Sequence, residues 1–189
     1  FLHSLFFGVP LIPHSLAGIF NTFVGRFFIT QIVGIADAGL YTIGCQIGSI
    51  IGLVATAFNQ AYVPWLFNKL NTNSDEEKTK IVEFTYLYFF IIAISAIVLG
   101  ALSKFLMNMI VGVQFQESAI HVIWIALGNS FDGAYYMVVN YVFYAEKTHL
   151  LSMVTLTGSL LNVIFSYFFI RWNGAIGAAQ AMSLTYFVV

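Results

Sequence analysis

Charged side chains are scarce in this sequence. Asp, Glu, Lys and Arg make up 8% of its 189 residues, whereas soluble domains carry about 25%. Hydrophobic residues make up 60%, and the mean hydropathy is +0.89. These values exclude an ordinary soluble domain and indicate an integral membrane protein. The net charge of −1 says nothing about partners, because the placement of charge matters in a membrane chain and its sum does not.

Motifs for catalysis and metal binding are also missing. Cys45 is the single cysteine, so neither an intrachain disulfide nor a cysteine metal cluster can form. There is no nucleotide-binding glycine loop and no Ser or Cys nucleophile signature. The four histidines, His3, His14, His121 and His149, lie on separate segments and do not indicate a metal site. We therefore expect no enzyme, no cofactor and no nucleic-acid partner.

The sequence has one strongly polar connection, Asn68 to Lys80. We expect it to be a water-exposed loop whose Ser74 and Glu77 could cap the following helix. A membrane glycosyltransferase or polymerase usually needs a larger aqueous loop for its acceptor chemistry, so this connection argues against one.

The chain starts at Phe1 without a charged leader and stops inside an apolar run, so we interpret it as an internal fragment.

Apolar stretches of membrane-spanning length follow one another along the chain. About 20 apolar residues cross a bilayer as a helix. The segment Ser103 to Glu117 has apolar residues at helical spacing on one side, which predicts an interfacial helix. The predicted class is an all-α membrane bundle of six spans with short connections. The expected spans are 11–33, 40–67, 81–102, 118–144, 150–170 and 178–189, the last truncated.

Basic residues are unevenly divided between the connections. Those after the second and fourth spans hold four lysines, against two basic residues after the third and fifth. The positive-inside rule then predicts that the Asn68 to Lys80 connection lies in the cytoplasm. The residues counted are Lys69, Lys78, Lys80 and Lys147, against Lys104 and Arg171.

Small and polar residues recur at helical spacing within the spans. Gly44, Gly48 and Gly52 form one bare stripe, which predicts a closely approaching neighbour helix. Three other spans carry polar rows that we expect to face inward, where hydroxyl and amide groups favour hydrogen bonds between helices. These rows are His14, Gly18, Thr22 and Arg26; Gly128, Asp132, Tyr136 and Asn140; and Thr155, Ser159, Asn162 and Ser166.

Arg26 is the most unusual residue of the first span. An arginine near a helix centre raises the free energy of membrane insertion by about 2.5–3.5 kcal/mol. The twelve Leu, Ile, Phe and Val residues of this span lower it by about 4–7 kcal/mol. Such a helix fits a bundle better than isolated lipid. Two interpretations stay open: Arg26 and Asp132 mark a substrate or ion route, or they pair with each other or with carbonyls to hold the bundle together.

Several motifs, in order, resemble those of the bacterial polysaccharide flippases, members of the multidrug/oligosaccharidyl-lipid/polysaccharide exporter superfamily. The resemblance covers nearly the whole chain and rests on the order and spacing of weakly specific elements. These are Gly39-Leu40-Tyr41, the run Ile47 to Ala61 closed by Pro64, Met109 to Phe115 with Ser118, Tyr135, Tyr141, Lys147-Thr148, Asn162, and Gly174-Ala-Ile-Gly177-Ala178-Ala179.

The resemblance implies that this chain is the C-terminal six-helix lobe of a two-lobe flippase, with an N-terminal lobe as its missing partner. The expected location is the bacterial cytoplasmic membrane. The expected activity is the flipping of an undecaprenyl-pyrophosphate-linked oligosaccharide by alternating access of the two lobes. A drug/cation antiporter of the same superfamily, or a non-transporting scaffold of a polysaccharide assembly complex, are the alternatives.

Site residues follow from this interpretation. Arg26 offers planar donors suited to a diphosphate head group, and we expect His14, Thr22 and Asn162 to contribute to substrate binding. Asp132 is the candidate for coupling to a proton or a sodium ion. The family often has an Asp-Arg pair where this chain has Gly25-Arg26, so the partner of Arg26 must lie on another helix or on the substrate. The proline often found before the last span is also missing.

Overall fold

The computed structural model describes residues 8–9, 11–72 and 74–188, with the backbone alone for Thr22. All the regular elements found in these residues are helical. They are α2 (Leu11–Ile32), α3 (Ile35–Gly48), α4 (Ile50–Thr72), α5 (Asp75–Leu106), a π-helix (Met107–Val111), a 3₁₀-helix (Val113–Ser118), α6 (Ala119–Tyr144), α7 (Thr148–Asn173) and α8 (Ile176–Val188).

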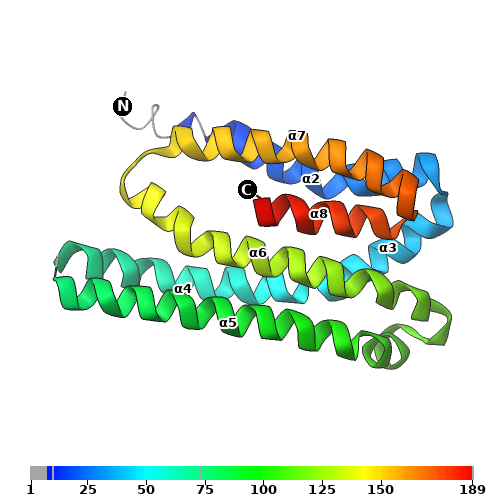
Figure 1. The fold of residues 1–189 in the computed structure, drawn as a ribbon, viewed down its shortest axis with the longest axis horizontal. Helices are drawn as coiled ribbons and strands as arrows, with labels where there is room; N and C mark the ends of the chain where they lie inside the picture. Colours follow the sequence, from blue (N-terminus) through cyan, green and yellow to red (C-terminus); the bar gives the residue numbers. More distant parts are fainter. Residues whose placement is uncertain (1–7, 10, 73, 189) are drawn as a thin grey trace.

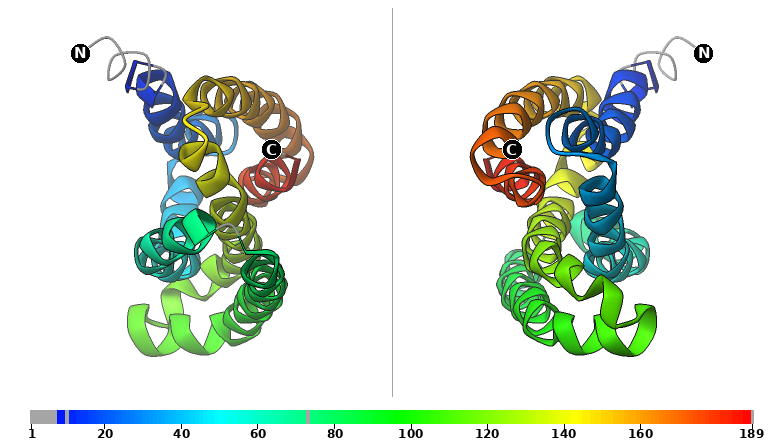
Figure 2. Two further views of the ribbon diagram at one scale, coloured as in Figure 1. Left: turned by 90° about the vertical axis from the view of Figure 1, so that its left-hand side faces the viewer. Right: turned by 90° about the vertical axis from the view of Figure 1, so that its right-hand side faces the viewer.

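Helix α6 runs through the middle of the bundle. Figure 1 shows α2, α7 and α8 on one side of it and α4 and α5 on the other. The two end-on views in Figure 2 show the same division, with α3 leading from the first group to the second. Each half of the bundle therefore packs against a single central helix.

The all-α membrane class predicted from the sequence is confirmed. Within the described residues, four helical stretches are long and apolar enough to cross a membrane, and α8 is shorter. The expected count of six spans does not match this number. Helix α2 is not among the four. This agrees with the sequence analysis, in which Arg26 offsets much of the favourable free energy of membrane insertion of this segment. The four stretches are Ile35–Thr72, Asp75–Val111, Val113–Tyr144 and Thr148–Asn173.

The second span differs from its predicted bounds. We expected a connector over 34–39 and one helix over 40–67, but α3 already begins at Ile35 and a break at Ser49 separates it from α4. Asp37 in the first turn of α3 complements the positive end of the helix dipole, which favours this early start. Gly34, with φ of 149°, makes the turn that a residue with a side chain rarely adopts.

The predicted loop from Asn68 to Lys80 is mostly helical. Helix α4 extends to Thr72, and α5 begins at Asp75 with three acidic residues in its first turn, where the helix dipole stabilises them. The proposed cap is wrong, because Ser74 makes no side-chain capping bond. Glu77 instead pairs with Lys69 of α4 at 2.8 Å.

The predicted interfacial helix over Ser103 to Glu117 is also wrong as a single element. Helix α5 continues to Leu106, and the π-helix and 3₁₀-helix follow on either side of Gly112, whose φ is 119°. The positive φ ends the helix here, because helical residues have negative φ, and glycine adopts a positive φ readily. Exposed apolar side chains do gather in this segment: Phe105, Met109, Ile110 and Val113.

The lysine-rich connections lie at one end of the bundle. The α4–α5 and α6–α7 connections are on the left of Figure 1, and the α5–α6 and α7–α8 connections are on the right. The helices thus alternate in direction as membrane spans do. The cytoplasmic location of the lysine-rich end stays a prediction from the distribution of basic residues.

The glycine stripe packs directly against α6, as predicted. A Cβ atom added to Gly44 would lie 2.7 Å from the Cβ of His121, and one added to Gly48 would lie 2.7 Å from Cγ2 of Ile125. At Gly52 an added Cβ would collide with the Asn129 side-chain amide. Three successive turns of α3 and α4 therefore contact α6 with backbone alone.

Other helices approach α6 through glycines as well. A Cβ added to Gly100 of α5 would lie 2.6 Å from Cδ1 of Ile123. On α6 itself, Gly128 faces Ser183 of α8, and Gly133 admits Tyr88, whose hydroxyl would be 3.1 Å from an added Cβ. The central position of α6 depends on these glycines, because they have no side chain that would hold the neighbouring helices apart.

We predict that Gly48→Ala destabilises the folded protein by about 1–3 kcal/mol, the usual range for overpacking, because Ile125 and the Val122 carbonyl leave no room for a methyl group. Gly39→Ala is the matched control, since nothing lies within 4 Å of its added Cβ and α3 should gain about 0.5–1 kcal/mol. Unfolding in detergent micelles measures both. Equal effects of the two substitutions would show that the α3–α6 contact is not tight.

Candidate functional site

Polar side chains from four helices meet around a cavity of about 290 Å³. It lies between α2, α6, α7 and α8, so residues far apart in the sequence share it. The cavity contains His14 and Asp132, two of the residues selected from the sequence. Its full lining is His14, Ser15, Gly18, Asn21, Asp132, Tyr135, Tyr136, Thr155, Gly158, Thr185 and Tyr186.

His14 is held by Thr155 across the α2–α7 contact. Its Nδ1 lies 2.6 Å from the Thr155 hydroxyl oxygen, and that hydroxyl donates its proton to the Leu151 carbonyl at 2.8 Å. Because the threonine proton is already used, Nδ1 of His14 must be the donor. Nε2 of a neutral His14 is then an acceptor.

Asp132 is half-buried and surrounded by tyrosines. Tyr136, one turn further along α6, lies close enough to interact with its carboxylate and with Thr56 of α4. Tyr135 and Tyr186 line the cavity beside it. Tyr88 reaches the same region from α5 through the space at Gly133. The carboxylate therefore has aromatic hydroxyl groups for neighbours and forms no ion pair within the described part of the chain.

Asn162 lies behind the cavity and does not line it. Its Nδ2 donates to the Thr185 hydroxyl at 3.3 Å, and that hydroxyl donates to the Ala181 carbonyl at 2.8 Å. Both side chains are buried, with 4% and 2% of their surface exposed. Asn162 thus orients a lining residue. Together with the bond from Ser159 to the Ala17 carbonyl, this confirms that the polar row of α7 makes hydrogen bonds between helices.

Arg26 lies outside this cavity. It is twelve residues beyond His14, about 18 Å along the helix axis, and each step of four residues turns about 40° further around the helix. The four-residue row of α2 therefore drifts by about 120° between the two residues. Arg26 reaches α3 instead, where it interacts with Tyr41 and Cys45. Its Nε is buried without a hydrogen-bond partner.

Gly25 allows this contact between α2 and α3. A Cβ at this position would lie 3.2 Å from the Tyr41 hydroxyl and 3.2 Å from Cβ of Ala178. An aspartate here would have to displace both neighbours. Close packing thus accounts for the glycine that stands where the resembled family often has an acid.

Arg26 and Asp132 do not form an ion pair. The ion pairs found among the described residues join α4 to α5 or lie within the start of α5. Thr22, the remaining candidate of the α2 row, has a side chain outside the described part of the chain. The two charges inside the bundle therefore have separate surroundings.

Two polar atoms of the cavity lining are buried without a partner, the Asn21 Oδ1 and the Tyr135 hydroxyl. Asn21 is not one of the site residues selected from the sequence, because it lies outside the four-residue row of the first span. Thr185 and Tyr186 were missed altogether. Their position on α8, packed against α6 and α7, depends on tertiary structure, for which residue spacing carries no signal.

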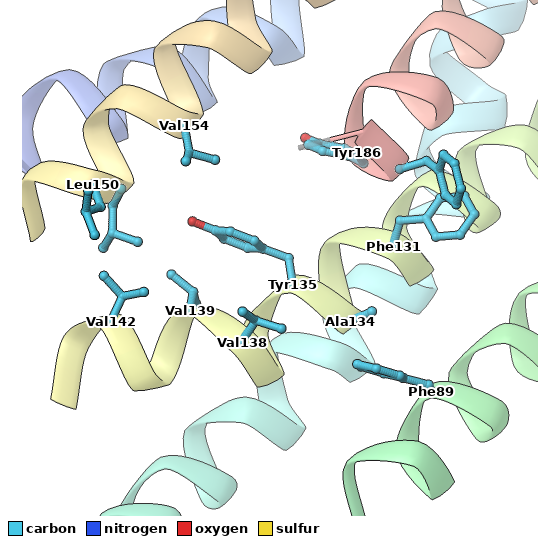
Figure 3. Close-up of a pocket in the computed structure, with 12 residues that line it drawn as sticks. Phe89, Phe131, Ala134, Tyr135, Val138, Val139, Val142, Leu150, Val154 and Tyr186 are labelled. Atoms are coloured by element: carbon cyan, nitrogen blue, oxygen red, sulfur yellow. The ribbon is translucent and has the colours of Figure 1, made fainter. Parts of the chain in front are cut away.

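An apolar groove of about 360 Å³ adjoins the polar cavity. Figure 3 shows Tyr135 projecting from α6 toward Leu150 and Val154 of α7 inside this groove. Val138 is 58% exposed, so the groove opens on the surface of the bundle. Tyr135 and Tyr186 line both volumes and separate the polar one from the apolar one.

The lining of the polar cavity favours ligands that donate hydrogen bonds or carry positive charge. Asp132 accepts hydrogen bonds when ionised, Asn21 has a free acceptor oxygen, and no lysine or arginine is among the lining residues. A metal centre of the usual kind is not formed, since no group of three or more His, Cys, Asp or Glu residues gathers in the described parts of the chain.

Two proteins of Haemophilus influenzae are similar to this chain over 98% of its length. One is named "Lsg locus putative protein 1" and is 26% identical; the other is named "Uncharacterized membrane protein" and is 28% identical. The alignments cover 48% and 47% of these proteins, so the chain spans about half the length of the curated relatives it matches. No family model and no solved structure matches it. The fold and the second relative agree on a multi-pass membrane protein.

The separation of the two charges can be tested with a double-mutant cycle. We predict that the effects of Arg26→Gln and Asp132→Asn on the free energy of unfolding are additive within about 0.5 kcal/mol, because the side chains share no partner. Unfolding of the wild type, both single variants and the double variant in detergent gives the interaction energy. A value above about 1 kcal/mol would mean that the two residues are paired after all.

Proposed function

We propose that this chain forms one lobe of a polysaccharide flippase, which moves an undecaprenyl-pyrophosphate-linked oligosaccharide across the bacterial cytoplasmic membrane. A second lobe, outside this sequence, would complete the transport path, with membrane lipids around both. The ordered motifs from Gly39 to Ala179 support this proposal. So does the similarity to two proteins of about twice the length, one of which is named a membrane protein and the other for the Lsg locus.

The observation that carries the proposal is the polar cavity inside the bundle. It brings an ionisable acid, Asp132, and a histidine, His14, together from helices more than a hundred residues apart in the sequence. Buried ionisable groups that face a cavity in membrane proteins commonly mark a substrate or ion route. Packing alone does not require them, because an apolar lining would be more stable in a membrane.

Each candidate residue has a distinct role under this proposal. Asp132 exchanges a proton or a sodium ion as the lobes alternate, and His14 is the second titratable group of the same cavity. Asn162 acts through Thr185 and so positions the cavity wall. Arg26, beside Tyr41 at a different depth, is the predicted contact for the diphosphate.

A cation antiporter is the second candidate. The lining of the cavity favours it, because the single charged side chain there is an acid with three tyrosines around it. The scaffold alternative would be favoured by a dry Arg26–Asp132 pair. That pair does not form between these two described residues.

The test is a flipping assay with the full-length protein in its own membrane. We predict that Asp132→Asn and Arg26→Ala each insert and fold, yet lower flipping at least about tenfold, leaving lipid-linked oligosaccharide on the cytoplasmic side. Glu83→Gln is the matched control, because it also neutralises an acid within a span but on the exposed side of α5. Accessibility of the oligosaccharide to a glycosidase added outside measures the product.

Normal flipping by well-expressed Asp132→Asn and Arg26→Ala variants would refute the proposal. Loss of organic-cation export in the same variants, with flipping unchanged, would identify the antiporter instead.

A further inference from the structure

We infer that the polar cavity binds a protonated amine, and that the sugar unit it receives is an amino sugar. The inference rests on the proposed flippase function and goes beyond it by naming the chemical class that this cavity recognises. It is carried by the charge of the lining, the aromatic rings around the acid and the free acceptors.

The charge of the lining selects a cation over a phosphate. Asp132 is the acid that faces the cavity, and neither lysine nor arginine is among the lining residues. A diphosphate would meet a carboxylate here with no compensating cation, since Arg26 lies on another part of the bundle. A positively charged amine would instead form a charge-assisted hydrogen bond with the carboxylate.

The rings around Asp132 strengthen this selection. Tyr135, Tyr136 and Tyr186 come from two helices and line the same cavity as the carboxylate. The faces of aromatic rings attract ammonium groups through the ring quadrupole, and the attraction grows when the site is shielded from water. A carboxylate framed by tyrosines is therefore well suited to an amine.

The remaining polar groups fit the hydroxyls of a sugar. Asn21 Oδ1 is a buried acceptor without a donor, and Nε2 of a neutral His14 is a second acceptor because its Nδ1 donates to Thr155. The Tyr135 hydroxyl is buried and also lacks a partner. A sugar hydroxyl could donate to Nε2 of His14 directly, and to Asn21 Oδ1 or the Tyr135 oxygen after a side-chain movement that uncovers these buried atoms.

The size of the cavity limits the occupant. At about 290 Å³ it is at the lower end of the roughly 300–1,000 Å³ typical of small-molecule sites. One monosaccharide unit is a suitable occupant and a whole oligosaccharide is too large. The cavity would thus hold one amino sugar of a longer chain.

Ligand-induced shifts of the unfolding midpoint of the full-length protein in detergent test this inference. The probes are glucosamine, glucose and N-acetylglucosamine at pH 7, where glucosamine carries the charged amine. A ligand that binds the folded state raises the midpoint by an amount that grows with the logarithm of its concentration divided by its Kd. We expect glucosamine to produce a given midpoint shift at an at least about tenfold lower concentration than either neutral sugar.

Three variants locate the effect. Asp132→Asn should abolish the preference for glucosamine. Tyr186→Leu should weaken it several-fold, while Tyr186→Phe, which keeps the ring and the fold, should retain most of it. If the leucine variant does not fold, the wild type, the Asp132 variant and the phenylalanine variant still decide the matter.

Equal shifts with glucosamine and glucose would overturn the inference, as would a preference that survives Asp132→Asn. A shift with sodium chloride that choline chloride does not reproduce, without any shift from glucosamine, would assign the cavity to a small inorganic cation instead. Failure here leaves the proposed function standing if Asp132→Asn still blocks flipping. An amine preference in a protein whose variants flip normally would support the cavity assignment and refute the flippase.

Discussion

The close approach of neighbouring helices to α6 is the constraint on which the rest of the structure depends. Glycines at positions 44, 48 and 52 bring α3 and α4 against one side of α6. Gly128 and Gly133 of α6 let α8 and α5 approach two other sides of this helix. Association between helices in a membrane is driven by packing and hydrogen bonds, because lipid is as apolar as the side chains. Without these contacts α6 could not present Asp132 to residues of α2, α7 and α8 at once.

Much of this organisation could be predicted from the sequence. Composition and apolar runs gave the all-α membrane class, and four-residue spacing identified the glycine stripe and the inward-facing row of α7. The limits of the helices were less predictable. Polar residues such as Asp75 and Glu77 suggested a loop, yet acidic residues in a first turn are also what stabilises the start of a helix.

The candidate site was predictable in part, for a geometric reason. His14 and Asp132 do share a cavity, but Arg26 does not join them, since a row of residues four apart drifts around a helix and cannot stay on one face for twelve residues. Thr185 and Tyr186 became site residues only through the packing of α8 between α6 and α7. Tertiary contacts of this kind have no local sequence signal.

Tyr135 and Tyr186 stand as a common wall between the polar cavity and the apolar groove. If either ring turns about its χ1 or χ2 bond, one volume grows as the other shrinks. The shapes of the polar cavity and of the apolar groove are therefore linked through the rotamers of these two side chains.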